Sequence, residues 1–179
     1  MLASRKRETK ETSILVSLDP EGSGKTEIET GIEMLDEILF AFAAGARFDL
    51  AVKARGDLET GDHHTTEDVG ITLGSALGEI IKKGIGSSIV PSGQAVAQVA
   101  VRFGEPGYSS KFVLQNKELG GMRLENFGHF LRTLATSAKF TLAVSADGGD
   151  DKSKIDAMCT ALGRAVRKAI RDEKISFCA

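Results

Sequence analysis

A nine-residue segment occurs twice in the chain, once in each half: Phe48–Gly56 reappears as Phe140–Gly148. Both copies alternate apolar residues with others, which is typical of a half-buried strand. The helical sequences that follow also align, with Leu73–Leu77 opposite Leu162–Val166. A repeat at about half the chain length predicts two copies of one supersecondary unit, each of which needs the other to cover its apolar face.

Each half is predicted to contain strands, a helix, another strand and a final helix. The expected strands are Thr12–Leu18, Lys25–Thr30, Phe48–Ala54, Ala95–Phe103, Lys111–Gln115 and Phe140–Ala146. The expected helices cover 32–42, 69–80, 126–138 and 151–170. Glycine and serine around Pro91 make 83–94 the expected junction. We therefore expect an α+β fold with half-domains 1–88 and 89–179, packed by pseudo-symmetry into one compact domain.

Composition predicts a globular protein of a reducing cytoplasm. The chain has 179 residues, of which 41% are hydrophobic and 27% charged, enough to bury a proper core. A net charge of −2 gives no basic field, so we expect no nucleic-acid partner. No apolar run is long enough for a bilayer, so no membrane partner is expected. Cys159 and Cys178 form no disulfide pattern, and Cys159 falls on an apolar helical stripe.

The segment Gly56–Asp68 holds two of the three histidines of the chain, His63 and His64, side by side. Glu67 follows His63 by one helical turn, so the two side chains share a face if the segment is helical. Imidazole and carboxylate groups placed in this way can converge on one divalent metal ion. The alternative is an exposed polar turn that leads into a helix.

Four segments of the chain match motifs that occur in the same order in one enzyme family. They are Arg7–Thr12 (family pattern RxTKET), Thr30–Leu39 (TGxxFLDHML), Gly56–Asp68 (GDLxxDDHHTVED) and Glu125–Phe130 (the EHFF region). With these four segments the chain resembles the imidazoleglycerol-phosphate dehydratase family. The resemblance implies two half-domains, each a four-stranded sheet with two helices on one face, as in ribosomal protein S5 domain 2-like folds. It also implies a homo-oligomer of as many as 24 subunits, with metal, typically manganese, bound between subunits.

The family places a lone helical histidine and an HHxxE motif in each half, and the repeat allows each position to be compared. His129 stands opposite Glu37, which takes the place of the lone histidine of the first half. The residues opposite the triplet His63, His64 and Glu67 are Lys152, Ser153 and Asp156. We therefore expect at most one well-occupied metal site per chain, at His63, His64 and Glu67, completed by Glu37 or His129 of a neighbour. For His129 alone, the alternative is a partly buried helical histidine.

The basic residues with which the family binds the substrate phosphate are largely replaced. The first arginine is missing from 83–91, the second arginine position falls on Pro106, and Thr160 takes the place of a lysine. A phosphate dianion needs charge-assisted donors in fixed places, and Arg102 is the candidate substitute.

The resemblance implies dehydration of imidazole glycerol phosphate to imidazole acetol phosphate, a step of histidine biosynthesis. The metal would hold the substrate imidazole as an anion, and hydroxide would leave through a diazafulvene-like intermediate. Glu11 matches the opening glutamate of the family, which binds substrate and transfers a proton, and Glu67 would be a metal ligand or a base. The replaced positions predict weakened activity. The alternative function is a non-catalytic or repurposed homologue that forms assemblies or binds a ligand.

Overall fold

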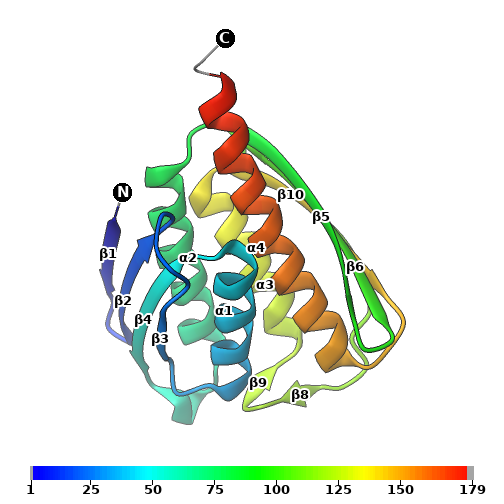
Figure 1. The fold of residues 1–179 in the computed structure, drawn as a ribbon. Coiled ribbons are helices and arrows are strands. Elements are labelled where there is room, and N and C mark those ends of the chain that lie inside the picture. Colours follow the sequence, from blue (N-terminus) through cyan, green and yellow to red (C-terminus); the bar gives the residue numbers. More distant parts are fainter. Residues whose placement is uncertain (1, 177–179) are drawn as a thin grey trace.

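The computed structural model describes residues 2–176, and this part of the chain forms two four-stranded sheets with the same topology (Figure 1). The first sheet has the order β1-β2-β4-β3. Its strands are β1 (Ala3–Glu8), β2 (Thr12–Asp19), β3 (Thr26–Glu29) and β4 (Asp49–Gly56). Neighbouring strands β1, β2 and β4 are antiparallel, whereas β3 runs parallel to β4 at the edge.

The second sheet has the order β5-β6-β10-β7 and repeats this pattern strand for strand. Its strands are β5 (Gly84–Ser92), β6 (Ala95–Phe103), β7 (Gly107–Lys111) and β10 (Phe140–Asp147). Strands β5, β6 and β10 are antiparallel, and β7 is parallel to β10. The repeated segments of the sequence are thus equivalent strands, β4 and β10. A short hairpin of β8 (Glu118–Leu119) and β9 (Met122–Arg123) is added in the second half.

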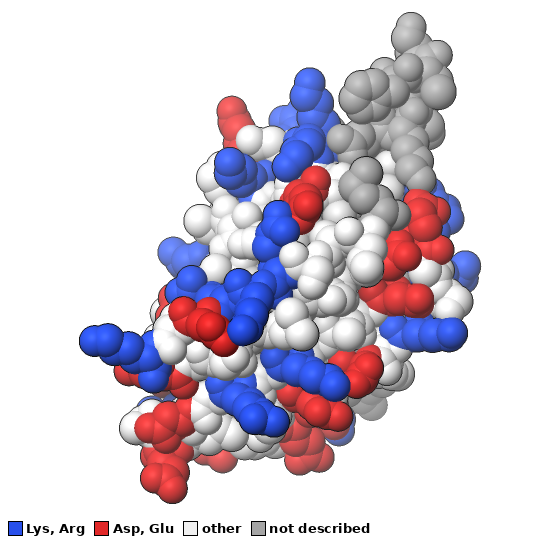
Figure 2. All heavy atoms as spheres, turned by 90° about the vertical axis from the view of Figure 1, so that its left-hand side faces the viewer, with Lys and Arg blue, Asp and Glu red and all other residues white. Residues whose placement is uncertain are grey.

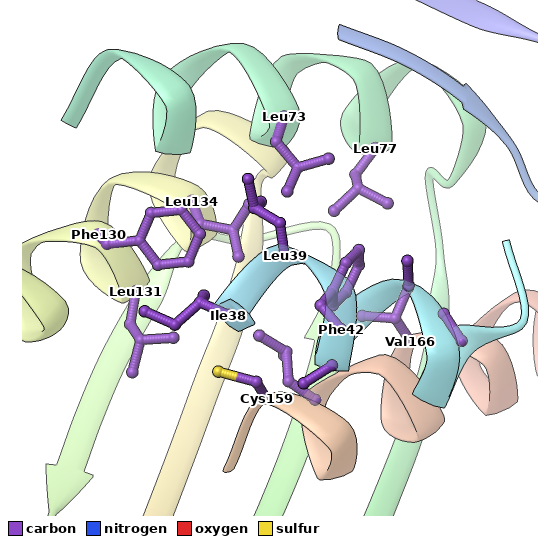
Figure 3. Packing of buried hydrophobic residues seen from close by; sticks show 14 of the residues in the cluster. Ile38, Leu39, Phe42, Leu73, Leu77, Phe130, Leu131, Leu134, Cys159 and Val166 are labelled. Carbon is purple, nitrogen blue, oxygen red and sulfur yellow. The ribbon is translucent and has the colours of Figure 1, made fainter. Parts of the chain in front are cut away.

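The helices lie between the two sheets and form the core. They are α1 (Glu33–Ala46), α2 (His63–Ile80), α3 (Glu125–Ala138) and α4 (Asp151–Ser176). Helix α2 packs on α3, and α1 packs on α4, so each half contributes one helix to each pair. Figure 3 shows Leu39 and Phe42 of α1 among Leu73, Leu134 and Val166 of the other helices. The predicted duplicated α+β fold is confirmed, because each half covers the apolar face of the other.

Small residues set the distance at both helix crossings. A Cβ atom added to Gly163 of α4 would collide with the Phe42 carbonyl of α1, and one added to Gly45 would collide with the Thr160 carbonyl. At the other crossing, a Cβ atom on Gly74 of α2 would lie 2.6 Å from the Leu134 carbonyl oxygen of α3. Gly74 and Gly163 occupy aligned positions of the repeat, so the two crossings are built in the same way.

The prediction that 83–94 is a junction was wrong, because most of this segment forms strand β5. Its glycines are needed for packing: a Cβ atom on Gly86 would collide with the backbone of α4 at Ala165. The strand expected at Lys111–Gln115 lies earlier in the chain, because β7 covers Gly107–Lys111. The division between residues 88 and 89 stays a prediction, and β5 spans it.

Strand β1 at the N-terminus was not among the strands predicted from the sequence. Ala3 is its one buried residue, and the strand carries several charged side chains on an exposed edge. Figure 2 shows basic and acidic side chains intermingled on this side of the molecule. Lys6 pairs with Glu8 and Lys53 pairs with Glu27, so charges of both signs are matched on the first sheet.

Cys159 lies in the core, as the apolar stripe predicted, and burial raises the pKa of its thiol above the ordinary range. Cys178 lies outside the described residues. Within residues 2–176, none of the helices has both the length and the apolar character to span a bilayer.

Candidate active site

Three histidines gather where α2 of the first half meets α3 of the second half. His63 and His64 begin α2, and His129 lies one turn into α3. The ring centroid of His63 is 5.6 Å from that of His64 and 5.7 Å from that of His129. The packing of α2 on α3 therefore joins residues that are far apart in the sequence, and we call this group, with Glu67, the histidine cluster.

A buried amide fixes the orientation of the His63 ring. The Asn126 Nδ2 group donates to Asp62 Oδ2 at 2.8 Å, so the amide oxygen must face the imidazole. That oxygen lies 3.0 Å from His63 Nδ1, which is therefore the protonated nitrogen. Asp62 and Asn126 are both buried, so the arrangement is shielded from water. In a neutral His63, Nε2 is therefore the unprotonated nitrogen, and its lone pair points away from Asn126.

The outward nitrogen of His63 faces an acceptor. Its Nε2 lies 3.5 Å from Glu67 Oε2, one helical turn along α2. A lone pair and a carboxylate that face each other repel unless a proton, a cation or a water molecule lies between them. The donor set of imidazole nitrogen and carboxylate oxygen suits a divalent transition metal. The residues of this cluster therefore fit a metal ion.

Glu11 lies beside the second histidine. Its Oε2 atom is 3.1 Å from His64 Nδ1. The hydroxyl of Thr9 accepts hydrogen bonds from the backbone N–H groups of Glu11 and Thr12, which fixes the turn between β1 and β2. The Glu11 carboxylate remains largely exposed, so a ligand can reach it.

Hydrogen bonds link the sequence motif around Arg7 to the motif around His63. Asp68 of α2 is buried, and its two oxygens accept from Arg7 at 2.6 Å and from the Thr12 hydroxyl at 2.5 Å. These bonds join the β1–β2 turn, which carries Glu11, to the first turns of α2, which carry His64. Charge-assisted bonds of this kind fix relative position. The spacing of Glu11 and His64 is thus set by residues outside the cluster.

Two predicted site residues lie elsewhere in the chain. Glu37 of α1 contacts Lys152 of α4, with 3.0 Å between Oε1 and Nζ, and makes no contact with the histidines among the described residues. Arg102 is exposed on β6, between buried Val101 and Phe103, so it points away from the helices. A neighbouring subunit would have to bring either residue to the histidine cluster.

The same chain supplies no complete metal cage. Among the side chains described, no three His, Cys, Asp or Glu groups converge closely enough to hold an ion. His63 and Glu67 face one another, whereas His64 pairs with Glu11 and His129 meets His63 ring to ring. A metal bound at this cluster would therefore require a small rearrangement of side chains or a ligand from a second chain.

A cavity of about 920 Å³ lies next to the cluster, between β7, the β8–β9 hairpin and α3. His129 lies in its wall together with three basic residues, Lys117, Arg123 and Arg132, and two acidic ones, Glu118 and Glu125. Glu125 pairs with Arg123 at 4.0 Å. The Arg132 guanidinium lies 5.1 Å from the centroid of the Tyr108 ring, and the buried Tyr108 hydroxyl has no hydrogen-bond partner within the described residues. The cavity therefore offers donors to an anionic group beside the histidines.

Sequence reasoning missed the residues that support the cluster. Asn126 and Arg7 lie inside segments that match family motifs, but neither was predicted as a ligand or a reacting group. Arg132 lies two residues beyond its segment. A search for buried polar residues at the ends of aligned helices could have found Asn126 and Asp62, because burial of an amide or carboxylate requires a partner.

The fold and the cluster together define a class: a duplicated α+β protein with a candidate metal and acid–base site where helices of its two halves meet. Comparison with known proteins specifies the family. The family model described as imidazoleglycerol-phosphate dehydratase matches residues 30–166. The dehydratase of Methanothermobacter thermautotrophicus is 41% identical over 173 residues, with 93% of this chain and 89% of the relative covered. The dehydratase of Acetivibrio thermocellus is 43% identical over 177 residues, with 94% and 91% covered.

Solved structures agree with the sequence comparisons. The dehydratase of Pyrococcus furiosus in complex with (S)-C348 superposes with a TM-score of 0.79 at 32% identity, with 93% of each chain covered. The Staphylococcus aureus dehydratase gives a TM-score of 0.83 at 27% identity, with 94% of this chain and 98% of that chain covered. The chain belongs to the imidazoleglycerol-phosphate dehydratase family.

Proposed function

We propose that the protein dehydrates imidazole glycerol phosphate to imidazole acetol phosphate, as a carbon–oxygen lyase of histidine biosynthesis. Family membership supports the reaction class, and one structural observation carries the assignment to this chain. Two carboxylates, Glu11 and Glu67, each lie beside one imidazole of an adjacent histidine pair. Paired acid–base groups around a candidate cation site are what the removal of a carbon-bound proton and a hydroxyl group requires.

The histidine cluster would hold one divalent metal ion per chain, and we infer manganese. His63, His64, Glu67 and His129 are the candidate ligands, and the Asn126 bond leaves His63 Nε2 free to bind. When bound, the metal would supply positive charge that stabilises an anionic substrate imidazole. The fit rests on two acceptors, His63 Nε2 and Glu67 Oε2, that face each other at 3.5 Å.

Proton transfer falls to Glu11. The turn at Thr9 and the contact with His64 hold its carboxylate at the rim of the cluster, where it is open to substrate. Glu67 is held against His63 and is better placed as a ligand than as a base. Glu11 would also contact the substrate, because a group that moves a proton must lie within hydrogen-bond reach of the reacting carbon or oxygen.

The substrate phosphate needs cations near the cluster. In the neighbouring cavity, the Arg132 guanidinium over Tyr108 supports a phosphate contact from the same chain. Arg102, the candidate from the sequence, could contribute only from a neighbouring subunit. Bidentate binding by a guanidinium group suits a phosphate dianion, so Arg132 is the stronger candidate.

The active form would be a cytoplasmic homo-oligomer, with 24 subunits as the upper expectation from the family. The outward face of the second sheet supports a subunit contact. Ile85, Ile89 and Val96 are exposed there, whereas the first sheet presents matched charges. Exposed apolar side chains on one face of a sheet are a common mark of an interface.

Turnover of imidazole glycerol phosphate by the purified, manganese-loaded protein tests the proposal. We expect measurable turnover at a reduced rate, together with growth of a histidine auxotroph that lacks the dehydratase. Glu11→Gln should lower kcat while the metal content stays unchanged, and His63→Ala should lower both. Absence of turnover in a folded, metal-loaded protein would favour the non-catalytic homologue instead.

A further inference from the structure

The crossing of α1 with α4 carries a counterpart of the histidine cluster in which every ligand position has changed. Helices α1 and α4 pack as α3 and α2 do, and the repeat aligns Glu37 with His129. The residues Lys152, Ser153 and Asp156 occupy the positions of His63, His64 and Glu67. Because both sheets share one topology, these side chains gather at an equivalent place in the fold.

An ion pair occupies this place. Lys152 Nζ donates to Glu37 Oε1 at 3.0 Å, and these two residues align with His63 and His129, whose rings meet where α2 packs on α3. Asp156 accepts from the Ser92 hydroxyl at 2.7 Å. Glu37 and Asp156 line one cavity of about 480 Å³. The two remaining carboxylates of the counterpart therefore each have a partner from the protein.

The residues of the counterpart do not fit a metal ion. An ammonium group has three donors and no lone pair, so it cannot act as a ligand. The Glu37 carboxylate raises the pKa of Lys152, with further contributions from Glu33 and Asp150, so the ammonium form is favoured. A fixed positive charge beside Glu37 also opposes the approach of a divalent ion. Serine in place of the second histidine leaves no imidazole nitrogen at all.

We propose that Lys152 is a tethered cation that takes the place of a metal ion at the α1–α4 counterpart of the histidine cluster. Its charge neutralises Glu37 at the α1–α4 contact without any dependence on metal supply. The α1–α4 counterpart thereby excludes divalent metals, which leaves the histidine cluster as the candidate metal position among the described residues. This inference depends on the proposed function at one point only, namely that the histidine cluster binds a metal ion.

Metal content measured by mass spectrometry, after manganese loading and removal of free metal, tests this directly. One variant restores all four positions: Glu37→His, Lys152→His, Ser153→His and Asp156→Glu. Its matched control carries the same changes but retains Lys152. We expect the four-fold variant to hold one equivalent of manganese per chain more than the wild-type protein. The control that retains Lys152 should match the wild type.

Two outcomes would overturn the proposal. One is failure of the folded four-fold variant to gain metal, or an equal gain in the control. The other is a second equivalent in the wild-type protein that is lost with Glu37→Gln. The comparison is between variants, so it remains valid even if the histidine cluster of the wild type holds no metal. That result would contradict only the metal site in the proposed function.

A single substitution tests the proposal if the four-fold variant does not fold. Lys152→Gln removes the charge from an exposed side chain and should strengthen weak manganese binding at this position at least severalfold in an electron paramagnetic resonance titration. Lys168→Gln, on the same helix, should leave the titration unchanged, because its ammonium contacts the Ser87 carbonyl instead. Equal titrations for Lys152→Gln and the wild type would contradict the tethered cation.

Discussion

At the scale of single residues, the site depends on groups that neither bind nor react. Asn126 orients His63, Asp62 orients Asn126, and Asp68 joins Arg7 and Thr12 to the helix that carries the histidines. Such supporting contacts set which nitrogen of an imidazole is available to a metal. The ligand set is therefore only part of what a family member must retain.

Replacement of Asn126 tests this orientation. Asn126→Leu removes the acceptor at His63 Nδ1, and the loss of such a support commonly lowers metal affinity about 10–100-fold. We expect a loss of that size in a manganese titration. Asn116→Leu is the control, because that amide contacts Asp151 of the second half. Unchanged affinity in Asn126→Leu would show that the buried amide serves stability alone.

The phosphate contact is also tested at a single residue. Arg132→Gln removes a charged donor beside the cluster, and such bonds contribute roughly 1.5–3 kcal/mol. We expect the KM for imidazole glycerol phosphate to rise about tenfold or more, with a smaller change in kcat. Arg164→Gln, an exposed residue of α4, should leave both constants unchanged. If Arg102→Gln raised KM and Arg132→Gln did not, the contact would come from a neighbouring subunit.

At the scale of elements, the crossings of α2 with α3 and α1 with α4 determine where the functional side chains meet. Gly74 and Gly163 allow close approach at equivalent positions, so the ends of the helices are set by the same geometry in both halves. One crossing brings His63 to His129, and the other brings Lys152 to Glu37.

Added volume at a crossing should destabilise the fold. In Gly74→Ala, the new Cβ atom would lie 2.6 Å from the Leu134 carbonyl oxygen, and overpacking of this kind costs about 1–3 kcal/mol. We expect a lower Tm in thermal unfolding. Gly128→Ala is the control, since its nearest neighbour would be the Tyr108 hydroxyl at 3.9 Å and alanine favours a helix. A similar loss in both variants would mean that close approach is not the reason for Gly74.

The Glu37–Lys152 pair should contribute little to stability. Its side chains are 40% and 62% exposed, and exposed ion pairs contribute roughly 0–1 kcal/mol. We expect Lys152→Gln to shift the Tm only slightly in thermal unfolding. A large drop would indicate that the lysine is retained for folding, and would weaken its interpretation as a replacement for a metal ion.

The elements also show how far the sequence predicts the structure. The alternating strands Phe48–Ala54 and Phe140–Ala146 and the apolar stripes of the helices are local patterns, so β4, β10 and the helices were predicted. Strand β5 was missed because its glycines serve contacts with α4 that are remote in sequence. Of the site, aligned motifs identified the histidines and Glu11. The Lys152–Glu37 contact and the role of Asn126 depend on helix packing, which no local pattern reveals.

At the scale of the whole molecule, the two sheets differ although their topology is the same. The outward face of the first carries basic and acidic side chains and one large exposed apolar residue, Leu15 (Figure 2), whereas the second exposes Ile85, Ile89 and Val96. A duplication therefore supplies two surfaces of different character as well as two clusters of different chemistry.

We expect the protein to be an oligomer that associates through the second sheet. Ile89→Glu should shift the mass measured by light scattering toward the monomer, because it places a charge on an apolar contact. Leu15→Glu, on the outward face of the first sheet, should leave the mass unchanged; Ile89 is 66% exposed and Leu15 43% exposed in the single chain. A wild-type protein that is monomeric at micromolar concentration would contradict the proposed assembly.

The central claim is that one metal per chain, at the histidine cluster, supports the dehydratase reaction. Titration of metal-free protein with manganese, with turnover of imidazole glycerol phosphate measured at each addition, tests it most directly. We predict that turnover rises until one equivalent per chain is bound and then stays constant. The plateau should lie about 10²–10³-fold below that of a relative with both clusters, the usual cost of one missing group that stabilises the transition state. Turnover that continues to rise to two equivalents, or turnover that is absent at every ratio, would contradict the account.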